Sequence, residues 1–105
     1  MPTPGSPRIR YVIIHKPGPK WARGVDFREQ PGIELHVAHY RAVFDAGQLD
    51  FGGPFLLVDA GGMMIPVPTL TEDQVRQIAE SDPAVKGGLL EFEIRPWYVA
   101  MSRDS

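Results

Sequence analysis

The stretch HVAHYRAVFDAGQLDFGGP, residues 36 to 54, limits the possible folds more than any other part of the sequence. Apolar side chains recur at helical spacing up to Ala46, and Gly47 follows at a position where a left-handed conformation is cheap only for glycine. A strand pattern begins directly afterwards and is interrupted by a Gly-Gly-Pro break. The stretch therefore predicts a helix followed at once by a strand, and the other elements can pack around this pair.

Four segments have strand patterns and two have helical spacing. We predict strands at Arg8–His15, Gln48–Val58, Met63–Val67 and Leu89–Ala100, and helices at Ile33–Ala46 and from Thr71 to just before Asp82-Pro83. Thr71 to Gln74 matches a capping box, and Gly61-Gly62 indicates a hairpin turn. The order β-α-β-β-α-β predicts an α+β, ferredoxin-like fold, with a four-stranded antiparallel sheet and two helices on one face.

The domain is expected to span residues 8 to 100, between a flexible N-terminal tail at 1 to 7 and a C-terminal tail at 101 to 105. Inside it, residues 16 to 32 show neither helical nor alternating spacing. Connections of this length are usually lids, binding loops or disordered segments. Trp21 and Phe27 argue against disorder. Either they pin the loop to the surface, or they roof a pocket.

Composition excludes several classes of function. The 105 residues carry a net charge of −2, which gives no basic face for nucleic acid or membrane. The absence of cysteine excludes disulfides, thiolate chemistry and cysteine-ligated metals. No apolar run approaches the ~20 residues that span a bilayer, and the first ten residues lack the apolar core of a signal peptide. We therefore expect a cytoplasmic protein.

The sheet face opposite the two helices is expected to carry apolar groups of the first strand together with Trp97. Exposed apolar surface costs roughly 25 cal/mol per Å². A second copy stacked sheet against sheet would cover this face, so we expect a homodimer with two-fold symmetry. Glu91, Glu93 and Arg95 would then lie near the space between the sheets, where they must pair, meet water or line a cavity.

A set of short motifs resembles the YciI-like (YCII-related) family in order and spacing: His36, Gly47, Gly53-Pro54, Ser81-Asp82-Pro83 and Glu93-Ile94-Arg95-Pro96. The likeness covers Arg8 to Val99. Gly53-Pro54-Phe55 is also similar to the related DGPF group, with glycine in place of its aspartate. The resemblance implies a dimeric α+β barrel, a pocket between the first helix and the sheet, and His36 with Asp82 as an acid/base pair. Most members have no established reaction, and one branch is similar in fold to enzymes that eliminate chloride from chlorinated hydroxyaromatics.

His36 is also the best acid/base candidate on chemical grounds. An imidazole exchanges protons near neutrality, and this one lies at the border of the apolar helix stripe, where partial desolvation can tune it. Asp82, just past the second helix, could accept a hydrogen bond from one ring nitrogen and fix the tautomer. The alternative is that His36 packs its ring and bonds a carbonyl, while Asp82 only ends a helix.

The substrate-binding candidates are His39, Tyr40, Gly53, Pro54 and Trp21. His39 could be a second pocket residue, half exposed or part of the dimer contact. The glycine break either admits a substrate to the backbone or forms a β-bulge. His36 with His39 lacks a third metal ligand, so we expect no metal and no cofactor. His15, at the end of the first strand, is expected at the ordinary surface, although strand ends can rim a pocket.

Three functional hypotheses follow. The first is a cofactor-independent lyase or isomerase that uses His36 and Asp82 for proton transfer on a small, partly aromatic molecule. The second is a non-catalytic dimer that binds or senses a small ligand in the same pocket. The third is a dimerisation module with a vestigial pocket. A dry, enclosed cavity touching His36 would favour the first two, and a filled one the third.

Overall fold

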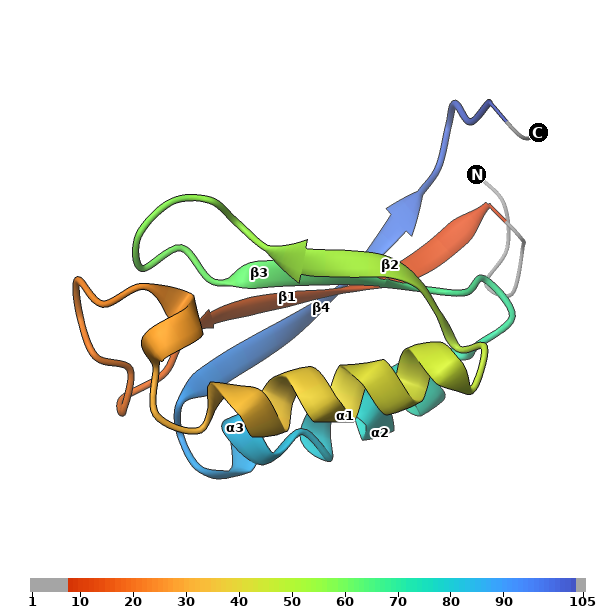
Figure 1. Ribbon diagram of the computed structural model, residues 1–105. Helices are drawn as coiled ribbons and strands as arrows, with labels where there is room; N and C mark the ends of the chain where they lie inside the picture. Colours follow the sequence, from red (N-terminus) through yellow and green to blue (C-terminus); the bar gives the residue numbers. More distant parts are fainter. Residues whose placement is uncertain (1–7, 104–105) are drawn as a thin grey trace.

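The computed structural model describes residues 8 to 103, and the predicted tail at 1 to 7 lies outside them, as do the last two residues. One antiparallel sheet has the strand order β2-β3-β1-β4. The helices lie together on one side of it (Figure 1). This is an α+β arrangement compatible with the predicted ferredoxin-like fold. The elements are β1 (Ile9–Pro17), a 3₁₀ turn (Phe27–Glu29), α1 (Ile33–Asp45), β2 (Leu49–Pro54), β3 (Gly62–Pro66), α2 (Glu72–Glu80), α3 (Pro83–Lys86) and β4 (Leu90–Tyr98).

The ends of the helices follow the expected local chemistry. Gly47, directly after α1, has a φ of 77°, the left-handed value that its position predicts. Its amide donates to the carbonyl of Phe44. At the start of α2, the Thr71 hydroxyl accepts from the Gln74 amide, and the Gln74 side chain accepts from the Thr71 amide. The predicted capping box is therefore present.

The helix α3 was not predicted. The sequence led us to expect that the chain leaves helical geometry at Asp82-Pro83, because proline disfavours a helical residue before it. Asp82 does have extended backbone, but its side chain accepts from the Ala84 amide and caps a new helical turn. Pro83 is suited to the first position of that turn, where no amide hydrogen is needed. The same two residues therefore end one helix and begin another.

The hairpin between β2 and β3 is wider than predicted. Pro54 already pairs with Gly62, so β2 ends at Pro54 rather than Val58, and the connection covers residues 55 to 61 rather than the Gly61-Gly62 turn. Asp59, at a φ of 60°, explains the difference. Its carboxylate accepts from the Trp21 indole at 2.7 Å and from the Gly24 amide. This draws the loop away from the sheet and towards the long first connection.

The main core lies between the sheet and the helices. In β4, Leu90, Phe92 and Ile94 pack on this side, as predicted from their alternation. A second cluster joins the long connection to α3 and the start of β4, so the residues 16 to 32 are packed rather than loose. The main cluster consists of Ile13, Tyr40, Val43, Leu49, Met64, Val75 and Ala79.

The opposite sheet face is less open than expected. Ile13 and Met64 point to the core, so alternation directs Val12 and Ile65 to the other face. Both are nevertheless buried within a single copy of the chain, while Trp97 stays 47% exposed. The apolar area that a second subunit could cover is therefore centred on Trp97 rather than on the first strand. Within residues 8 to 103, no helix is long and apolar enough to cross a bilayer.

Candidate functional site

His36 and Asp82 are in direct contact, although 46 positions separate them in the chain. The His36 Nδ1 atom lies 2.5 Å from the Asp82 Oδ2 atom. Helix α1 carries the histidine, and the aspartate caps α3, which packs beside α1. The Asp82 side chain has no exposed surface, whereas the His36 side chain keeps 12%. In this pair Asp82 is fully buried, and His36 lies at the boundary between the protein interior and solvent.

His15 completes the cluster, and its expected position at the ordinary surface is wrong. Only 2% of its side chain is exposed. Its Nε2 atom lies 3.9 Å from the Asp82 Oδ2 and 3.4 Å from the Tyr40 hydroxyl, and its ring stands edge-on to that of His36. The reason is that β1 continues to Pro17, so His15 is an interior strand residue. It shares the parity of Ile13, and this signal would have placed it on the core face.

Burial sets the charges of this cluster. It lowers the pKa of His15 to about 4, assisted by the nearby positive charge of His36. Burial also raises the pKa of Tyr40 far above its ordinary value. For Asp82, burial alone would raise the pKa, but the hydrogen bond and charge of His36 and the Ala84 amide outweigh it and lower the pKa. At neutral pH, His15 is uncharged, Tyr40 keeps its proton and Asp82 is an anion.

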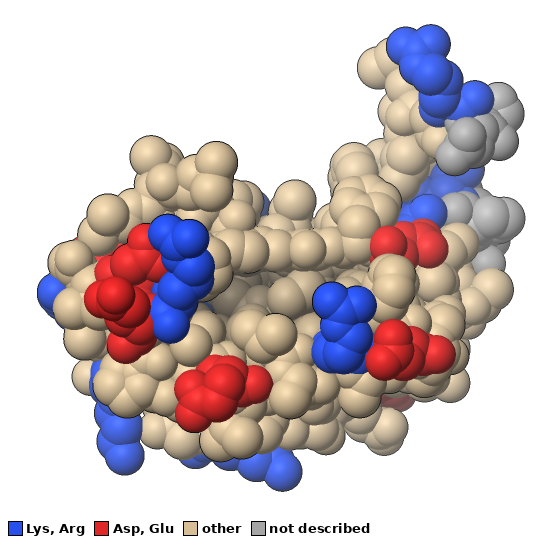
Figure 2. Space-filling view, in the orientation of Figure 1, with Lys and Arg blue, Asp and Glu red and all other residues tan. Residues whose placement is uncertain are grey.

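A pocket of about 470 Å³ opens beside the pair, a volume in the range of small-molecule sites. Figure 2 shows this face of the molecule hollowed near its centre. Its wall is mostly apolar and comes from α1, β2 and the long connection. Of the predicted binding residues, Tyr40, Gly53, Pro54 and Trp21 line it, together with His15 and His36.

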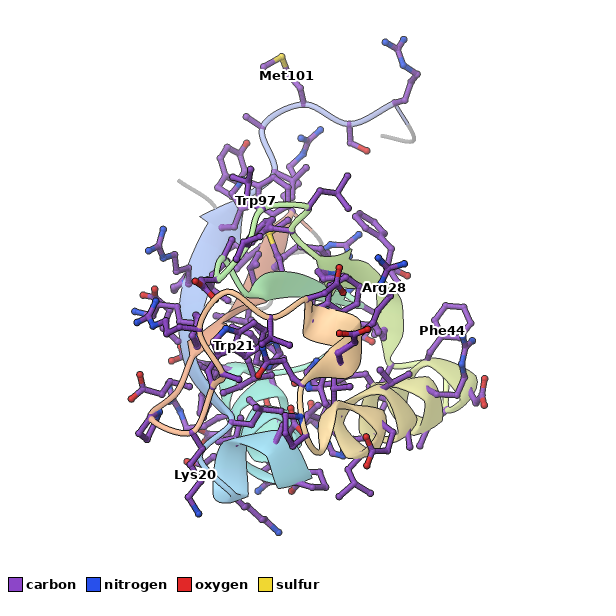
Figure 3. All side chains as sticks on the ribbon, turned by 60° about the vertical axis from the view of Figure 1, so that its left-hand side comes forward. Lys20, Trp21, Arg28, Phe44, Trp97 and Met101 are labelled. Atoms are coloured by element: carbon purple, nitrogen blue, oxygen red, sulfur yellow. The ribbon has the colours of Figure 1, made fainter. Side chains whose placement is uncertain are left out.

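Trp21 both anchors the long connection and lines the pocket. Its ring is 9% exposed, and its indole nitrogen donates to Asp59. Figure 3 shows it near the centre of the molecule, in contrast to Phe44 at the periphery. The two interpretations of the long connection are therefore compatible.

His39 lies elsewhere. It is not among the residues lining the pocket, and its Nε2 atom lies 2.8 Å from the carbonyl oxygen of Ile78. This hydrogen bond joins α1 to α2. Three residues after His36, the helix has turned far enough that the second imidazole faces the neighbouring helix. The structure thus separates the two histidines that the sequence placed side by side.

The glycine break shapes the pocket wall. A Cβ atom on Gly52 would lie 2.8 Å from the Met63 carbonyl oxygen and 3.0 Å from the Met64 Cα, so no side chain fits there. Gly53 has open space at the same position. The irregularity in strand pairing falls between Leu49 and Phe51, just before the glycines. A bulge therefore precedes the break, and the bare backbone of the break lines the pocket, while contact between a substrate and this backbone stays a prediction.

His15, His36 and Asp82 also form a cluster whose possible ligand atoms all lie within 4.8 Å of one another. Zinc bonds of about 2.0–2.1 Å in a tetrahedron hold neighbouring ligand atoms roughly 3.3 Å apart. The 2.5 Å between His36 Nδ1 and Asp82 Oδ2 is shorter than that, and shorter even than the ~2.7–2.9 Å of a charge-assisted hydrogen bond from nitrogen to a carboxylate. At this separation the two atoms share a hydrogen bond and are too close together to be neighbouring ligands of one zinc ion.

Known families, curated proteins and solved structures provide no match to this chain. The resemblance to YciI-like proteins therefore stays an expectation from sequence motifs. Function has to be argued from the pocket and its side chains.

Proposed function

We propose that this chain is a small YciI-like enzyme of the lyase or isomerase type, in which His36 and Asp82 transfer a proton on a small molecule held in the pocket. The observation that carries the proposal is the 2.5 Å contact between His36 Nδ1 and the buried Asp82 carboxylate, at the wall of an open pocket. A carboxylate at Nδ1 favours the tautomer with hydrogen on that nitrogen. The Nε2 atom is then left as a base for the ligand.

The proton transfer follows from this arrangement. His36 Nε2 accepts a proton from a carbon or hydroxyl of the substrate, and the buried anion of Asp82 stabilises the imidazolium that forms. Returning the proton to another atom of the substrate gives isomerisation. If the electron pair of the broken C–H bond instead expels a leaving group, the result is elimination. Neither path requires a cofactor.

His15 supports this chemistry by staying uncharged. A second positive ring 4.9 Å from His36 would compete for Asp82 and oppose protonation of His36. Because burial lowers the pKa of His15 to about 4, that competition is absent at neutral pH. His15 and Tyr40 thus provide a neutral wall beside the only polar pair that the mechanism uses.

A non-catalytic ligand-binding or sensing role is the second candidate. The mostly apolar wall favours it, since such a pocket can bind a ligand with a single hydrogen bond from His36. The open cavity is less compatible with a dimerisation module whose pocket is vestigial.

A homodimer through the sheet faces, forming an α+β barrel in the cytoplasm, also belongs to the proposal. Trp97 of β4 lies on this face and is 47% exposed. Beside it on the same face, Glu93 is bonded to Arg95 and to Lys16. An exposed aromatic centre with a charged border is the usual anatomy of a protein interface.

The test begins with a thermal-stabilisation screen over hydroxylated and halogenated aromatics, followed by turnover assays on the ligands found. We expect His36→Asn to abolish turnover while binding is retained. His39→Asn is the matched control, because it removes an imidazole from the same helix outside the pocket. Equal turnover by His36→Asn and the unmodified protein would rule out the catalytic role and leave the binding role.

A further inference from the structure

The pocket contains one positive charge without an acidic partner. Arg41 lines the pocket, and no carboxylate of residues 8 to 103 lies within ion-pair distance of it. Its guanidinium instead lies 5.6 Å from the centre of the Phe44 ring. Asp50 also lines the pocket, but its carboxylate is 2.6 Å from Arg10. The charge of Asp50 is thus already neutralised by Arg10, whereas the charge of Arg41 has no acidic partner among residues 8 to 103.

The number of arginines without a carboxylate partner determines how much negative charge a ligand in the pocket can carry. Arg28, which lines the adjoining smaller pocket, is bound through two nitrogens to Asp26 at 3.0 and 3.1 Å. Figure 2 shows basic side chains on either side of the hollow. Only one of these two arginines is without a carboxylate. A singly charged carboxylate therefore matches the site better than a doubly charged phosphate.

The walls between Arg41 and His36 favour a flat, apolar body. Aromatic rings have electron-rich faces and electron-poor edges, so they pack against another planar ring edge-on or in an offset stack. The bare backbone at Gly53, where a Cβ atom would meet nothing within 4 Å, leaves room in the part of the wall that β2 forms. The aromatic residues that line the pocket are Trp21, Phe27, Tyr40, Phe44 and Phe51.

The positions of the two groups on α1 are compatible with a ligand of one aromatic ring. Arg41 follows His36 by five residues, so their Cα atoms differ by about 7.5 Å along the helix axis and by about 140° around it, and both side chains line the same pocket. One aromatic ring with a substituent at each end spans a comparable distance. The guanidinium and the imidazole can therefore contact opposite ends of one such molecule.

We propose that the pocket takes an aromatic carboxylate, with its carboxylate on Arg41 and a hydroxyl or acidic C–H at the far end on His36 Nε2. This rests on the proposed function and specifies its substrate class. The aromatic rings hold the body of the ligand, Arg41 selects its charge, and His36 acts on its other end.

The experiment compares four probes by isothermal titration calorimetry: 4-hydroxybenzoate, its neutral analogue 4-hydroxybenzamide, benzoate without the hydroxyl, and the non-aromatic cyclohexanecarboxylate. We expect 4-hydroxybenzoate to bind about tenfold more tightly than the amide, the scale of one charge-assisted hydrogen bond at a partly exposed site. Arg41→Gln should remove that preference. Arg76→Gln, which deletes a positive charge on α2, should keep it.

Two affinity ratios distinguish a failure of this inference from a failure of the proposed function: acid over amide, and 4-hydroxybenzoate over benzoate. The preference for acid over amide depends on Arg41, and its absence in the unmodified protein, or its survival in Arg41→Gln, overturns the inference. The preference for 4-hydroxybenzoate over benzoate depends on His36. If that preference survives in His36→Asn, the role of His36 fails while the anion selectivity can stand. A failure of 4-hydroxybenzoate to bind, or equal binding of cyclohexanecarboxylate, also overturns the inference.

Because Arg41 is exposed, its replacement should not affect folding, and circular dichroism checks this. A second measurement needs no variant. Raising the salt concentration should weaken binding of the acid and leave binding of the amide unchanged, because only the acid interacts through charge. Parallel salt responses for both probes would contradict the inference.

Discussion

The two faces of the sheet each carry a carboxylate paired with a base, but in different surroundings. On the helix side, Asp82 is sealed from solvent and bonded to His36. On the other side, Glu93 and Arg95 are 3.1 Å apart, with the arginine side chain 66% exposed. The partner base lowers the carboxyl pKa in both pairs. Water screens the second pair and can replace either partner. Burial, rather than pairing, therefore distinguishes the candidate catalytic pair.

The largest effect should come from Asp82→Ala. It removes the cap of α3 and leaves His36 without its anion, so we expect the free energy of unfolding to fall by about 3–5 kcal/mol, the scale for breaking a buried pair. Urea denaturation measures this. Asp82→Asn keeps a good capping group and should lose less, which separates the cap from the charge. A cost for Asp82→Ala no greater than for Glu93→Gln would remove the contrast between the two faces.

Acid should destabilise the protein through His15. Its pKa is 6.5 when unfolded and about 4 when folded, so between these values the unfolded chain binds more protons. Stability from this group is complete above pH 6.5 and falls as the pH drops to 4, by about 3 kcal/mol in total. The lowered pKa of Asp82 adds a further loss only below its ordinary value of 3.8.

His15→Phe sharpens this test, because it fills similar space without titrating. Unfolding free energies measured from pH 7 to 4 should have a shallower slope in the variant. The slope is the relevant quantity, since the variant also changes packing against Tyr40. Identical slopes for the two proteins would mean that His15 is not held neutral by burial.

On the open face, Trp97→Ala tests the proposed dimer. Aromatic residues at the centre of an interface often carry much of its energy, so we expect the dimer dissociation constant to rise at least tenfold. Sedimentation equilibrium provides the measurement. Leu56→Ala is a control, because that side chain is 95% exposed in the β2–β3 loop. An unchanged constant for Trp97→Ala would count against sheet-to-sheet association.

The smallest effect belongs to the exposed pair. Glu93→Gln should leave thermal unfolding almost unchanged, and any effect should disappear in high salt. Scanning calorimetry at two salt concentrations checks this. A large, salt-independent loss would show that Glu93 is buried in the assembled protein, and would thereby support contact between two sheets.

Sequence reasoning succeeded where one local rule controls the structure. Gly47 after α1, the Thr71–Gln74 capping box and the alternation in β4 each depend on a few neighbouring residues. It also identified His36 and Asp82, through their place in a motif pattern. The contact between them could not be derived from spacing, because it requires α3 to pack beside α1.

The predictions for His15, for the β2–β3 hairpin and for His39 differ from the structure for another reason. His15 was misplaced because the end of β1 is set by pairing with β4, which continues to Pro17 opposite Leu90. The wide hairpin depends on Asp59 reaching Trp21, 38 positions away. Three-residue spacing made His39 a candidate pocket residue, with a half-exposed position or a dimer contact as the alternatives, whereas the structure bonds it to the Ile78 carbonyl of α2. Each outcome involves a partner distant in the chain, although for His15 the strand parity that it shares with Ile13 already indicates the core face.

The hydrogen bond between Asp59 and Trp21 also links the β2–β3 loop to the long connection at residues 16 to 32, so that the two segments are expected to move together. The β2–β3 loop carries Phe55 to Val58 at its exposed rim, and the indole at the other end of the bond forms part of the pocket wall. Displacing the loop must therefore either break this bond or drag the indole with it. A movement of the β2–β3 loop that widens the pocket should therefore change the fluorescence emission of Trp21.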